Sequence, residues 1–245
     1  MKCPGQDPMF WKPGDVFEIP CPKCGYGVEF LKYDVKRKCR CGHEIVNPKI
    51  NFGCAEWCPY GDTCIEGLPD EIKLKTQEEK KNRLRERISQ EMRKYFGEDL
   101  KRINHALKVA QYAEDILKIE GGDPLVVLGA AYLHDIGIKK AEEKYGSSSP
   151  EYQEKEGADL AREILMKLNV PKKAADEIYD IISHHHHPRP KETLNFQIVY
   201  EADLMVNFEE GYVGNGKTFA EIVDREFKTQ TGKRFAKVLL DKAHN

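Results

Sequence analysis

All eight cysteines of this 245-residue chain lie within residues 1–64, and none follows. A region of this size with few aliphatic residues buries too little apolar surface to fold securely by itself, so it needs disulfides or bound metal. The asymmetry therefore predicts a cysteine-rich metal-binding domain over residues 1–66, a connecting helix over 67–98 and a separate helical domain over 99–245.

Two close pairs of cysteines form the first candidate metal site of this region. Each pair is followed directly by a glycine, where a tight turn needs a permissive backbone. In a reducing cytosol, two such turns are expected to close a tetrahedron of thiolates around a structural zinc. The four cysteines are Cys21, Cys24, Cys39 and Cys41. The pattern resembles a zinc ribbon, although the second pair is Cys-x-Cys; the alternatives are two disulfides in an exported protein, or His43 in place of Cys41.

The other four cysteines, one remote and three clustered, form a second candidate site. Their spacing resembles the iron–sulfur staples of some nucleases, and four thiolates suit either a 4Fe-4S cluster or zinc. They are Cys3, Cys54, Cys58 and Cys64. We interpret this second cysteine site as structural; the alternatives are ordinary apolar cysteines or a redox or sensing role.

Composition indicates a water-soluble protein. The net charge of −2 gives no sign of a nucleic-acid partner. No apolar run approaches the roughly 20 residues that span a bilayer, so no membrane partner is expected. The N-terminus lacks the apolar segment of a signal peptide, and we expect a cytoplasmic protein.

The chain after the cysteines reads as consecutive helices. In the connecting segment, four apolar residues recur at four-residue spacing before Gly97: Leu84, Ile88, Met92 and Phe96. Capping residues or prolines then predict helices that start near Asp99, Asp123, Ser149 and Val170, and further helices over 196–208 and from Phe219.

Two of these helices carry finer expectations. The helix after Asp123 is expected to run from Leu125 to about Ile136 and to close at Gly137. The last helix is expected to be interrupted near Gly232. No strand is expected in this half, so we predict a mainly α protein: a helical bundle with a small metal-stapled N-terminal domain.

A series of metal-ligand residues runs through the predicted helices. Adjacent His134 and Asp135 lie in an apolar stretch, where buried polar groups need partners or a metal. Imidazole and carboxylate suit Zn, Fe, Mn or Ni better than Ca. The series consists of His105, His134, Asp135, the run His184–His187, and Asp203. Taken singly, each could instead be a satisfied core histidine, a helix end or a surface residue.

The order His, His-Asp-Ile-Gly, His-His, Asp resembles the HD-domain superfamily of metal-dependent phosphohydrolases over roughly residues 98–240. This resemblance implies an HD-type bundle with a divalent metal (Mn, Fe, Zn, Ni or Mg) at a site in its core. The implied metal ligands are His105, His134, Asp135, His185, His186 and Asp203, and the implied catalytic residues are Asp135, His185 and Lys139.

The resemblance also implies the activity. A small phosphorylated substrate, such as a nucleotide, is expected to be hydrolysed by a metal-activated water. Some relatives have a further histidine where this chain has Gln153, Glu154 or Glu156, which leaves one or two metals open. The alternatives are a di-iron oxygenase of the same fold, or a non-enzymatic metal-stabilised sensor or ligand-binding module.

Residues 211–218 match the phosphate-binding loop pattern Gly-x4-Gly-Lys-Thr. That motif needs a buried strand before it and a parallel sheet around it. Polar residues precede the segment and only 27 residues follow it. We therefore predict a glycine-rich loop between helices instead of a nucleotide-binding loop.

Overall fold

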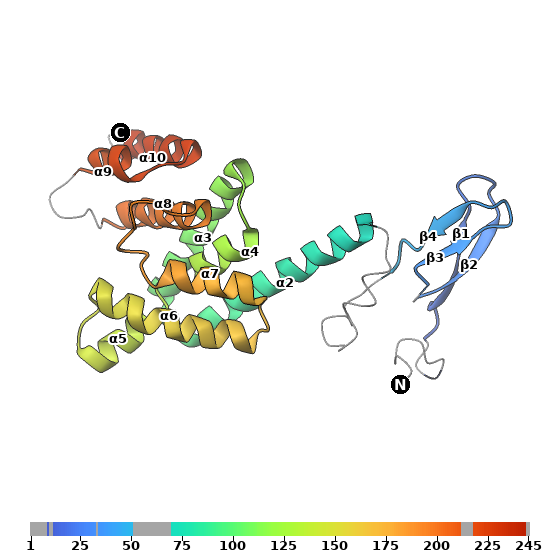
Figure 1. The fold of residues 1–245 in the computed structure, drawn as a ribbon, viewed down its shortest axis with the longest axis horizontal. Helices are drawn as coiled ribbons and strands as arrows, with labels where there is room; N and C mark the ends of the chain where they lie inside the picture. Colours follow the sequence, from blue (N-terminus) through green and yellow to red (C-terminus); the bar gives the residue numbers. More distant parts are fainter. Residues whose placement is uncertain (1–8, 10–11, 33, 51–69, 212–217, 244–245) are drawn as a thin grey trace. The chain divides into compact units, whose positions relative to one another are not determined.

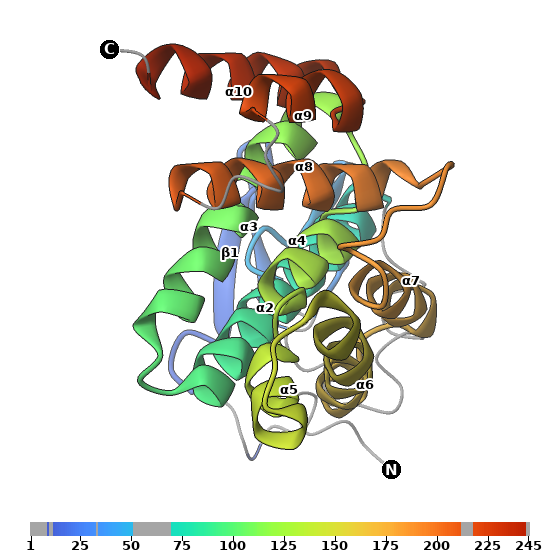
Figure 2. The same ribbon diagram turned by 90° about the vertical axis from the view of Figure 1, so that its left-hand side faces the viewer.

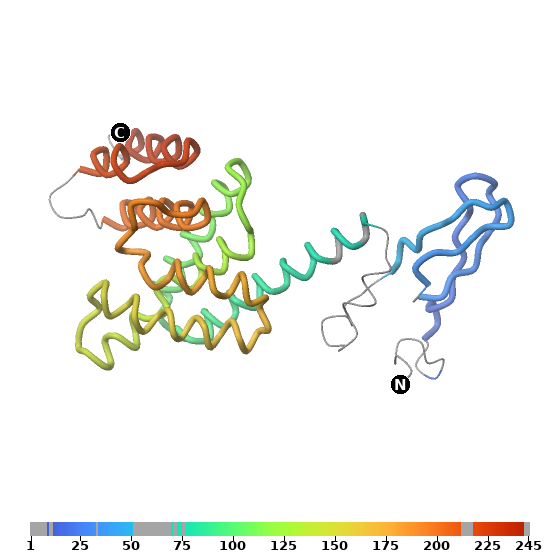
Figure 3. The backbone as a smooth tube through the Cα atoms, in the orientation of Figure 1, coloured from blue at the N-terminus to red at the C-terminus, as the bar shows by residue number. Residues whose placement is uncertain are grey.

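The computed structural model describes residues 9, 12–32, 34–50, 70–211 and 218–243. Tertiary contacts divide the chain into two compact units, residues 1–80 and 81–245, whose backbones are traced from blue to red in Figure 3. None of the helices in the described ranges is both long and apolar enough to cross a bilayer.

Two antiparallel hairpins make up the N-terminal unit: β1 (Val16–Pro20) with β2 (Gly27–Leu31), and β3 (Lys36–Lys38) with β4 (Glu44–Val46). Phe17 lies opposite Phe30 across the first hairpin, with ring centroids 6.2 Å apart. The buried core of the unit is small and includes two of the cysteines: Cys21, Val28, Phe30, Cys39 and Ile45. So few apolar side chains agree with the predicted need for a staple.

Helices make up the rest of the described chain (Figure 1). Their bounds are α2 (Asp70–Phe96), α3 (Leu100–Glu120), α4 (Pro124–Leu133), α5 (Ile138–Tyr145), α6 (Pro150–Lys167), α7 (Lys172–Ile182), α8 (Leu194–Glu209), α9 (Phe219–Glu226) and α10 (Gln230–Ala243). This confirms the mainly α fold class, with a small ribbon-like N-terminal unit.

Helix α4 forms the centre of the bundle. Eight of its ten residues are buried, as expected for a helix that is apolar on all sides. It packs against α3, α7 and α8, and Figure 2 shows α3, α4 and α8 side by side. Helix α6 packs against α5 and α7, whereas α10 packs against α3, α8 and α9.

The predicted helix starts and apolar faces are largely confirmed. The carboxylate of Asp99 accepts a hydrogen bond from the Arg102 amide at 3.2 Å, and that of Asp123 accepts one from the Leu125 amide at 2.9 Å. These bonds satisfy amides that have no partner within the helix. The four spaced apolar residues of α2 are all buried in the bundle core: Leu84, Ile88, Met92 and Phe96.

The expected end of α4 was wrong. The helix ends at Leu133, His134 to Gly137 form a turn, and the short helix α5 follows, which was not predicted. The reason is a close approach of backbones, because a Cβ atom on Gly137 would collide with the main chain of Gln153 and Gly157 in α6. The turn therefore needs a glycine to let α6 pass.

The expected interruption near Gly232 was also wrong. The break falls at residues 227–229, and Gly232 lies inside α10. The buried carboxylate of Glu201 accepts hydrogen bonds from the backbone amides of Lys228 and Thr229 at the start of α10, and a Cβ atom on Gly232 would collide with it. Gly232 thus makes room for a charged cap that has no sequence signature. Burial raises the pKa of Glu201.

Candidate metal centres

The series of predicted ligands converges from separate elements of the bundle. His105 lies on α3, His134 caps the C-terminus of α4, and Asp135 follows in the turn. Asp203 lies on α8, and His185 lies in the turn that follows α7. Four of these five residues are buried, and the Asp135 side chain is 18% exposed.

Short distances join these side chains into one cluster. The Nε2 atom of His105 lies 3.2 Å from Nε2 of His134 and 3.1 Å from Oδ1 of Asp203. Oδ2 of Asp135 lies 3.5 Å from Nε2 of His134, and its Oδ1 lies 3.7 Å from Nε2 of His185. The side chains of His105, His134 and Asp135 alone can supply three ligand atoms within 4.8 Å of one another.

The outer nitrogens of the three histidines define their tautomers. Nδ1 of His134 lies 2.9 Å from the Ala131 carbonyl, and Nδ1 of His185 lies 2.9 Å from the Ile182 carbonyl. Nδ1 of His105 lies 3.1 Å from a carboxylate oxygen of Glu210. Since carbonyl and carboxylate oxygens only accept, each Nδ1 carries a proton, so a ring that is neutral presents an Nε2 lone pair to the cluster.

The centre of the cluster is thus lined by hydrogen-bond acceptors. Three imidazole lone pairs face two carboxylates, and Nε2 of His185 is buried with no hydrogen-bond partner. Such a set is stable only when a proton or a cation lies within it. Imidazole nitrogens with carboxylate oxygens are a donor set for Mn, Fe, Ni or Zn, so the residues present fit a divalent transition metal.

The electrostatics of the cluster support this interpretation. Burial lowers the pKa of His134, but the carboxylates of Asp135 and Asp203 outweigh it and raise that pKa well above its ordinary value. Burial raises the pKa of Asp135, but His134 and His185 hold it well below its ordinary value. The carboxylates therefore stay ionised and attract positive charge, either protons on the histidines or a metal.

A second group of possible ligands shares one carboxylate with the first. The side chains of Asp135, His185 and His186 can each place a ligand atom within 4.8 Å of the others. Nε2 of His186 lies 3.2 Å from Oε1 of Gln153, and the Gln153 amide donates in turn to the Ser148 carbonyl. Burial and the neighbouring His185 lower the pKa of His186 to about 4, so this ring is neutral and able to bind a metal at neutral pH.

The outer two histidines of the run make different contacts. His184 lies 3.0 Å from a carboxylate oxygen of Glu192, and its ring stacks on Phe196. His187 donates to Glu154 at 2.8 Å, and Glu154 also accepts from the His186 amide at 2.8 Å. The run is thus divided between two inner rings near the cluster and two outer rings that brace the turn.

The lysine singled out in the sequence analysis and its neighbour Lys140 lie in other settings. Lys139, the predicted catalytic lysine, has its Nζ atom 5.9 Å from the ring centroid of Tyr95, and it lines a cavity formed with α2 and α6. Lys140 pairs with Glu156 at 3.0 Å. A catalytic role for Lys139 therefore stays a prediction without a contact to support it.

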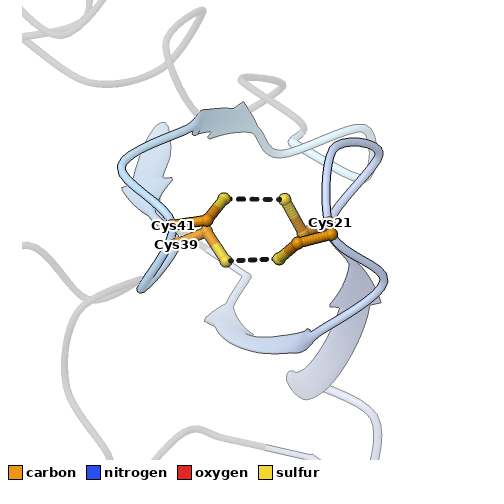
Figure 4. A group of neighbouring side chains, drawn as sticks. Cys21, Cys39 and Cys41 are labelled. Atoms are coloured by element: carbon orange, nitrogen blue, oxygen red, sulfur yellow. Dashed lines mark hydrogen bonds between the residues drawn. The ribbon is translucent and has the colours of Figure 1, made fainter.

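Four of the eight cysteines converge in the N-terminal unit. Sγ of Cys21 lies 3.7 Å from that of Cys41, and Sγ of Cys24 lies 3.6 Å from that of Cys39 (Figure 4). Sulfurs bound to one zinc at about 2.3 Å in a tetrahedron lie about 3.8 Å apart, so the spacing fits a four-thiolate zinc site. The group contains Cys41 and not His43, as the sequence analysis preferred.

Two turns of unequal length position these thiols. In the first turn, the Gly25 amide donates to the Cys21 carbonyl at 2.8 Å; in the second, one residue shorter, the Gly42 amide donates to the Cys39 carbonyl at 2.8 Å. Both glycines have positive φ, 74° and 86°. Burial raises the pKa of the Cys21 thiol, but backbone hydrogen bonds within the turn lower it to about 7, which favours the thiolate that binds metal.

The second cysteine set lies outside the described residues, so its prediction stays as it was: Cys3, Cys54, Cys58 and Cys64. The glycine-rich segment is described only at its two ends. Helix α8 precedes it where a phosphate-binding loop needs a strand, and Thr218 caps α9 with its side chain. The helices on both sides are those predicted, and residues 212–217 between them lie outside the described residues.

The contacts of two buried or half-buried carboxylates were not predicted, although the sequence analysis placed Glu154 among the residues that stand where some relatives have a further histidine. Glu210 binds His105, and Glu154 holds the amide of His186 and the ring of His187. Both bonds join residues that are far apart in sequence, so no local pattern could have found them.

Residues 102–207 match the family model of the HD domain. The fold is similar to the crystal structure of a predicted HD superfamily hydrolase from an uncultured Thermotogales bacterium, with 23% identity, a TM-score of 0.50, and 64% of this chain and 85% of that chain covered. The Lin1889 protein from Listeria innocua aligns with 19% identity and a TM-score of 0.44, over 67% of this chain and 93% of that chain. No curated protein matches the chain.

Proposed function

We propose, from the match of residues 102–207 to the HD domain, that the protein is a metal-dependent hydrolase of phosphate esters, with nucleotides or related small phosphorylated molecules as substrates. The observation that carries the proposal is the buried cluster of His105, His134, Asp135 and Asp203. In it, Nε2 of His105 lies 3.2 Å from Nε2 of His134 and 3.1 Å from a carboxylate oxygen of Asp203, and Nε2 of His134 lies 3.5 Å from a carboxylate oxygen of Asp135.

These four residues would hold a divalent ion. When bound, such an ion lowers the pKa of a water molecule and polarises a phosphoryl oxygen. Asp135 presents one oxygen to His134 and the other to His185, so it can hold a proton of an attacking water beside the ligands. His185 and His186 would complete a second metal position or bind the phosphate.

The surface beside the cluster supports an anionic substrate. A cavity of about 570 Å³ is lined by Lys101, Asn104, Leu107, Lys108 and Glu210. Glu210 also binds His105, so the cavity adjoins the proposed metal ligands. Two ammonium groups and an amide at helical spacing along α3 are donors that a phosphate can use.

For the N-terminal unit we propose a structural zinc held by Cys21, Cys24, Cys39 and Cys41. The sulfur spacing supports this assignment, and the small core supports the need for it. The second cysteine set would hold zinc or a 4Fe-4S cluster.

One experiment tests the assignment of the helical centre. The anaerobically purified protein is analysed for metals and assayed against phosphomonoesters, phosphodiesters and nucleotides, with Asp135→Ala as the inactive control. Metal-dependent release of phosphate in the wild type alone is expected. Oxygen-dependent turnover of a di-iron form without hydrolysis would favour the oxygenase, and tight ligand binding without turnover would favour a sensor.

A further inference from the structure

His105 differs from the other two histidines of the cluster in its outer hydrogen bond. The Nδ1 atoms of His134 and His185 donate to neutral backbone carbonyls within their own turns. The Nδ1 atom of His105 instead donates to a carboxylate oxygen of Glu210 at 3.1 Å, across 105 residues of sequence. A carboxylate partner makes an imidazole a stronger electron donor than a carbonyl partner does.

Both ring nitrogens of His105 are bound by one helix. Asp203 on α8 lies 3.1 Å from its Nε2, and Glu210, the C-terminal cap of the same helix, lies 3.1 Å from its Nδ1. Seven residues of helix rise by about 10.5 Å and return to the same face, so the imidazole lies along α8 between two carboxylates. The ring therefore cannot turn without breaking one of these contacts.

The position of Glu210 is itself well defined. Its amide donates to the Val206 carbonyl at 2.9 Å, which continues the bonding of α8 into the cap, and its side chain is only 19% exposed. Its other carboxylate oxygen lies 3.9 Å from Nζ of Lys108. A half-buried carboxylate at a rigid helix end can hold a ring in one orientation more firmly than a side chain on a loop can.

We propose that Glu210 is a positioning residue of the metal centre: by accepting the Nδ1 proton of His105, it presents the Nε2 lone pair to the ion and strengthens that ligand. The inference rests on the metal binding of the proposed function and not on its substrate. It therefore survives if the bound metal turns out to support another reaction.

The neighbouring Glu209 is a matched control. It carries the same charge one residue away, and its carboxylate accepts from the Tyr112 hydroxyl at 2.6 Å. A carboxylate oxygen of Glu209 lies 3.9 Å from Nζ of the same Lys108. Among the contacts of the described residues, none joins Glu209 to His105. Replacing it removes one negative charge at the same helix end without touching the ligand.

The test measures Mn²⁺ affinity by the electron paramagnetic resonance signal of the free ion, since Mn²⁺ prefers nitrogen and oxygen ligands to thiolates. Glu210→Ala is expected to weaken binding roughly 10- to 100-fold, as loss of an outer partner of a ligating histidine usually does. Glu210→Gln keeps an acceptor but loses the charge, so its affinity is expected between those of the alanine variant and the wild type. Glu209→Ala is expected to bind within about twofold of the wild type.

A second measurement separates positioning from general loosening of the fold. The ¹⁵N spectrum of histidine-labelled, metal-free protein should lose one Nδ1-protonated ring in Glu210→Ala and keep it in Glu209→Ala. Wild-type Mn²⁺ affinity in Glu210→Ala, or an equal loss in Glu209→Ala, would overturn the proposal. Where the alanine variant does not fold, wild-type affinity in Glu210→Gln overturns it. If the wild type binds Mn²⁺ but hydrolyses no phosphate ester, the proposed function fails and this inference stands.

Discussion

The two candidate metal centres are assembled in opposite ways. The cysteine group takes all its ligands from two turns between Cys21 and Cys41, in a unit whose described residues form a buried core of five side chains. The helical group takes its ligands from α3, α4, the turn that follows α4, and α8, between residues 105 and 203, inside a large apolar core. In the N-terminal unit, a bound metal would stabilise the fold. In the helical unit, the packed helices position the candidate ligands.

This difference predicts that the two sites will tolerate substitutions differently. Thiolates in a small unit replace a missing core, so their loss removes the main source of stability. The helical ligands are held in place by packing that does not depend on a metal, because the apolar side chains around them are buried in any case. A ligand substitution there should change chemistry far more than stability.

The largest expected effect is the loss of the N-terminal fold on removal of its metal. Cys24→Ser should release zinc and unfold residues of the hairpins, since structural zinc contributes on the order of 10 kcal/mol in small zinc domains. Zinc content and amide chemical-shift dispersion measure this. Stoichiometric zinc with unchanged spectra in the variant would contradict a four-thiolate site.

The next effect should be seen in activity and not in folding. Asp135→Ala should lose the metal of the helical centre and lower hydrolysis on the order of 10⁴-fold, the usual scale for a member of a catalytic group. The helical unit should keep its fold, as measured by circular dichroism, and the cysteine-bound metal should stay as in the wild type. Asp203→Ala should behave in the same way; loss of the cysteine-bound metal in either variant would break the comparison.

A core substitution should have the converse result. Ile88 is fully buried on α2, so Ile88→Ala should destabilise the helical unit by about 2–5 kcal/mol through the cavity that it leaves. Leu74 on the same helix is 67% exposed, and Leu74→Ala should change stability by less than about 0.5 kcal/mol. Urea unfolding followed by circular dichroism compares the two variants.

A smaller effect should depend on pH. Hydrogen bonds from Lys144, Tyr145 and Lys140 lower the pKa of the buried Glu156 carboxylate to about 2, from an ordinary value of 4.5. A depressed folded-state pKa means that the stabilisation is fully present above pH 4.5 and is lost as pH falls toward 2. Glu156→Gln should therefore cost about 1 kcal/mol at pH 7, with the gap closing in acid. A gap that stays constant between pH 7 and pH 3 would refute this account.

The smallest effect is expected in the glycine-rich segment. Lys217→Ala should leave hydrolysis within about twofold of the wild type, because a helix precedes the segment where a nucleotide-binding loop would need a strand. Initial rates with a nucleotide substrate test this. Abolished turnover in Lys217→Ala, with normal turnover in Asp135→Ala, would move the phosphate chemistry out of the helical centre.

Local signals in the sequence predicted most of the fold. The caps at Asp99 and Asp123 and the spaced apolar residues of α2 act within one or two turns, so a single chain displays them. The two errors, the end of α4 and the position of the break before α10, both come from contacts between distant elements. Gly137 meets α6, and Gly232 meets Glu201.

The candidate site also combines residues that the sequence could predict with residues that it could not. The order of the candidate ligands, read through the resemblance to the HD-domain superfamily, predicted residues that the structure brings together, because each is of a recognisable type. The residues that orient them could not be predicted, since Glu210 and Glu154 are ordinary surface-type residues in any local window. Their role appears only when α8 meets α3 and when α6 meets the histidine run.

Gly137 and Gly157 let two backbones approach closely, so no side chain separates the turn after α4 from α6 at this point. On one side of it lies the turn that carries His134 and Asp135, and on the other lies α6, which carries Gln153 to His186 and Glu154 to the backbone of the histidine run. A Cβ atom at residue 137 would collide with the backbone of α6 and push the turn and the helix apart. Two residues without side chains therefore set the distance between this turn and α6, and with it the spacing between Asp135 in the turn and His186, which Gln153 of α6 contacts.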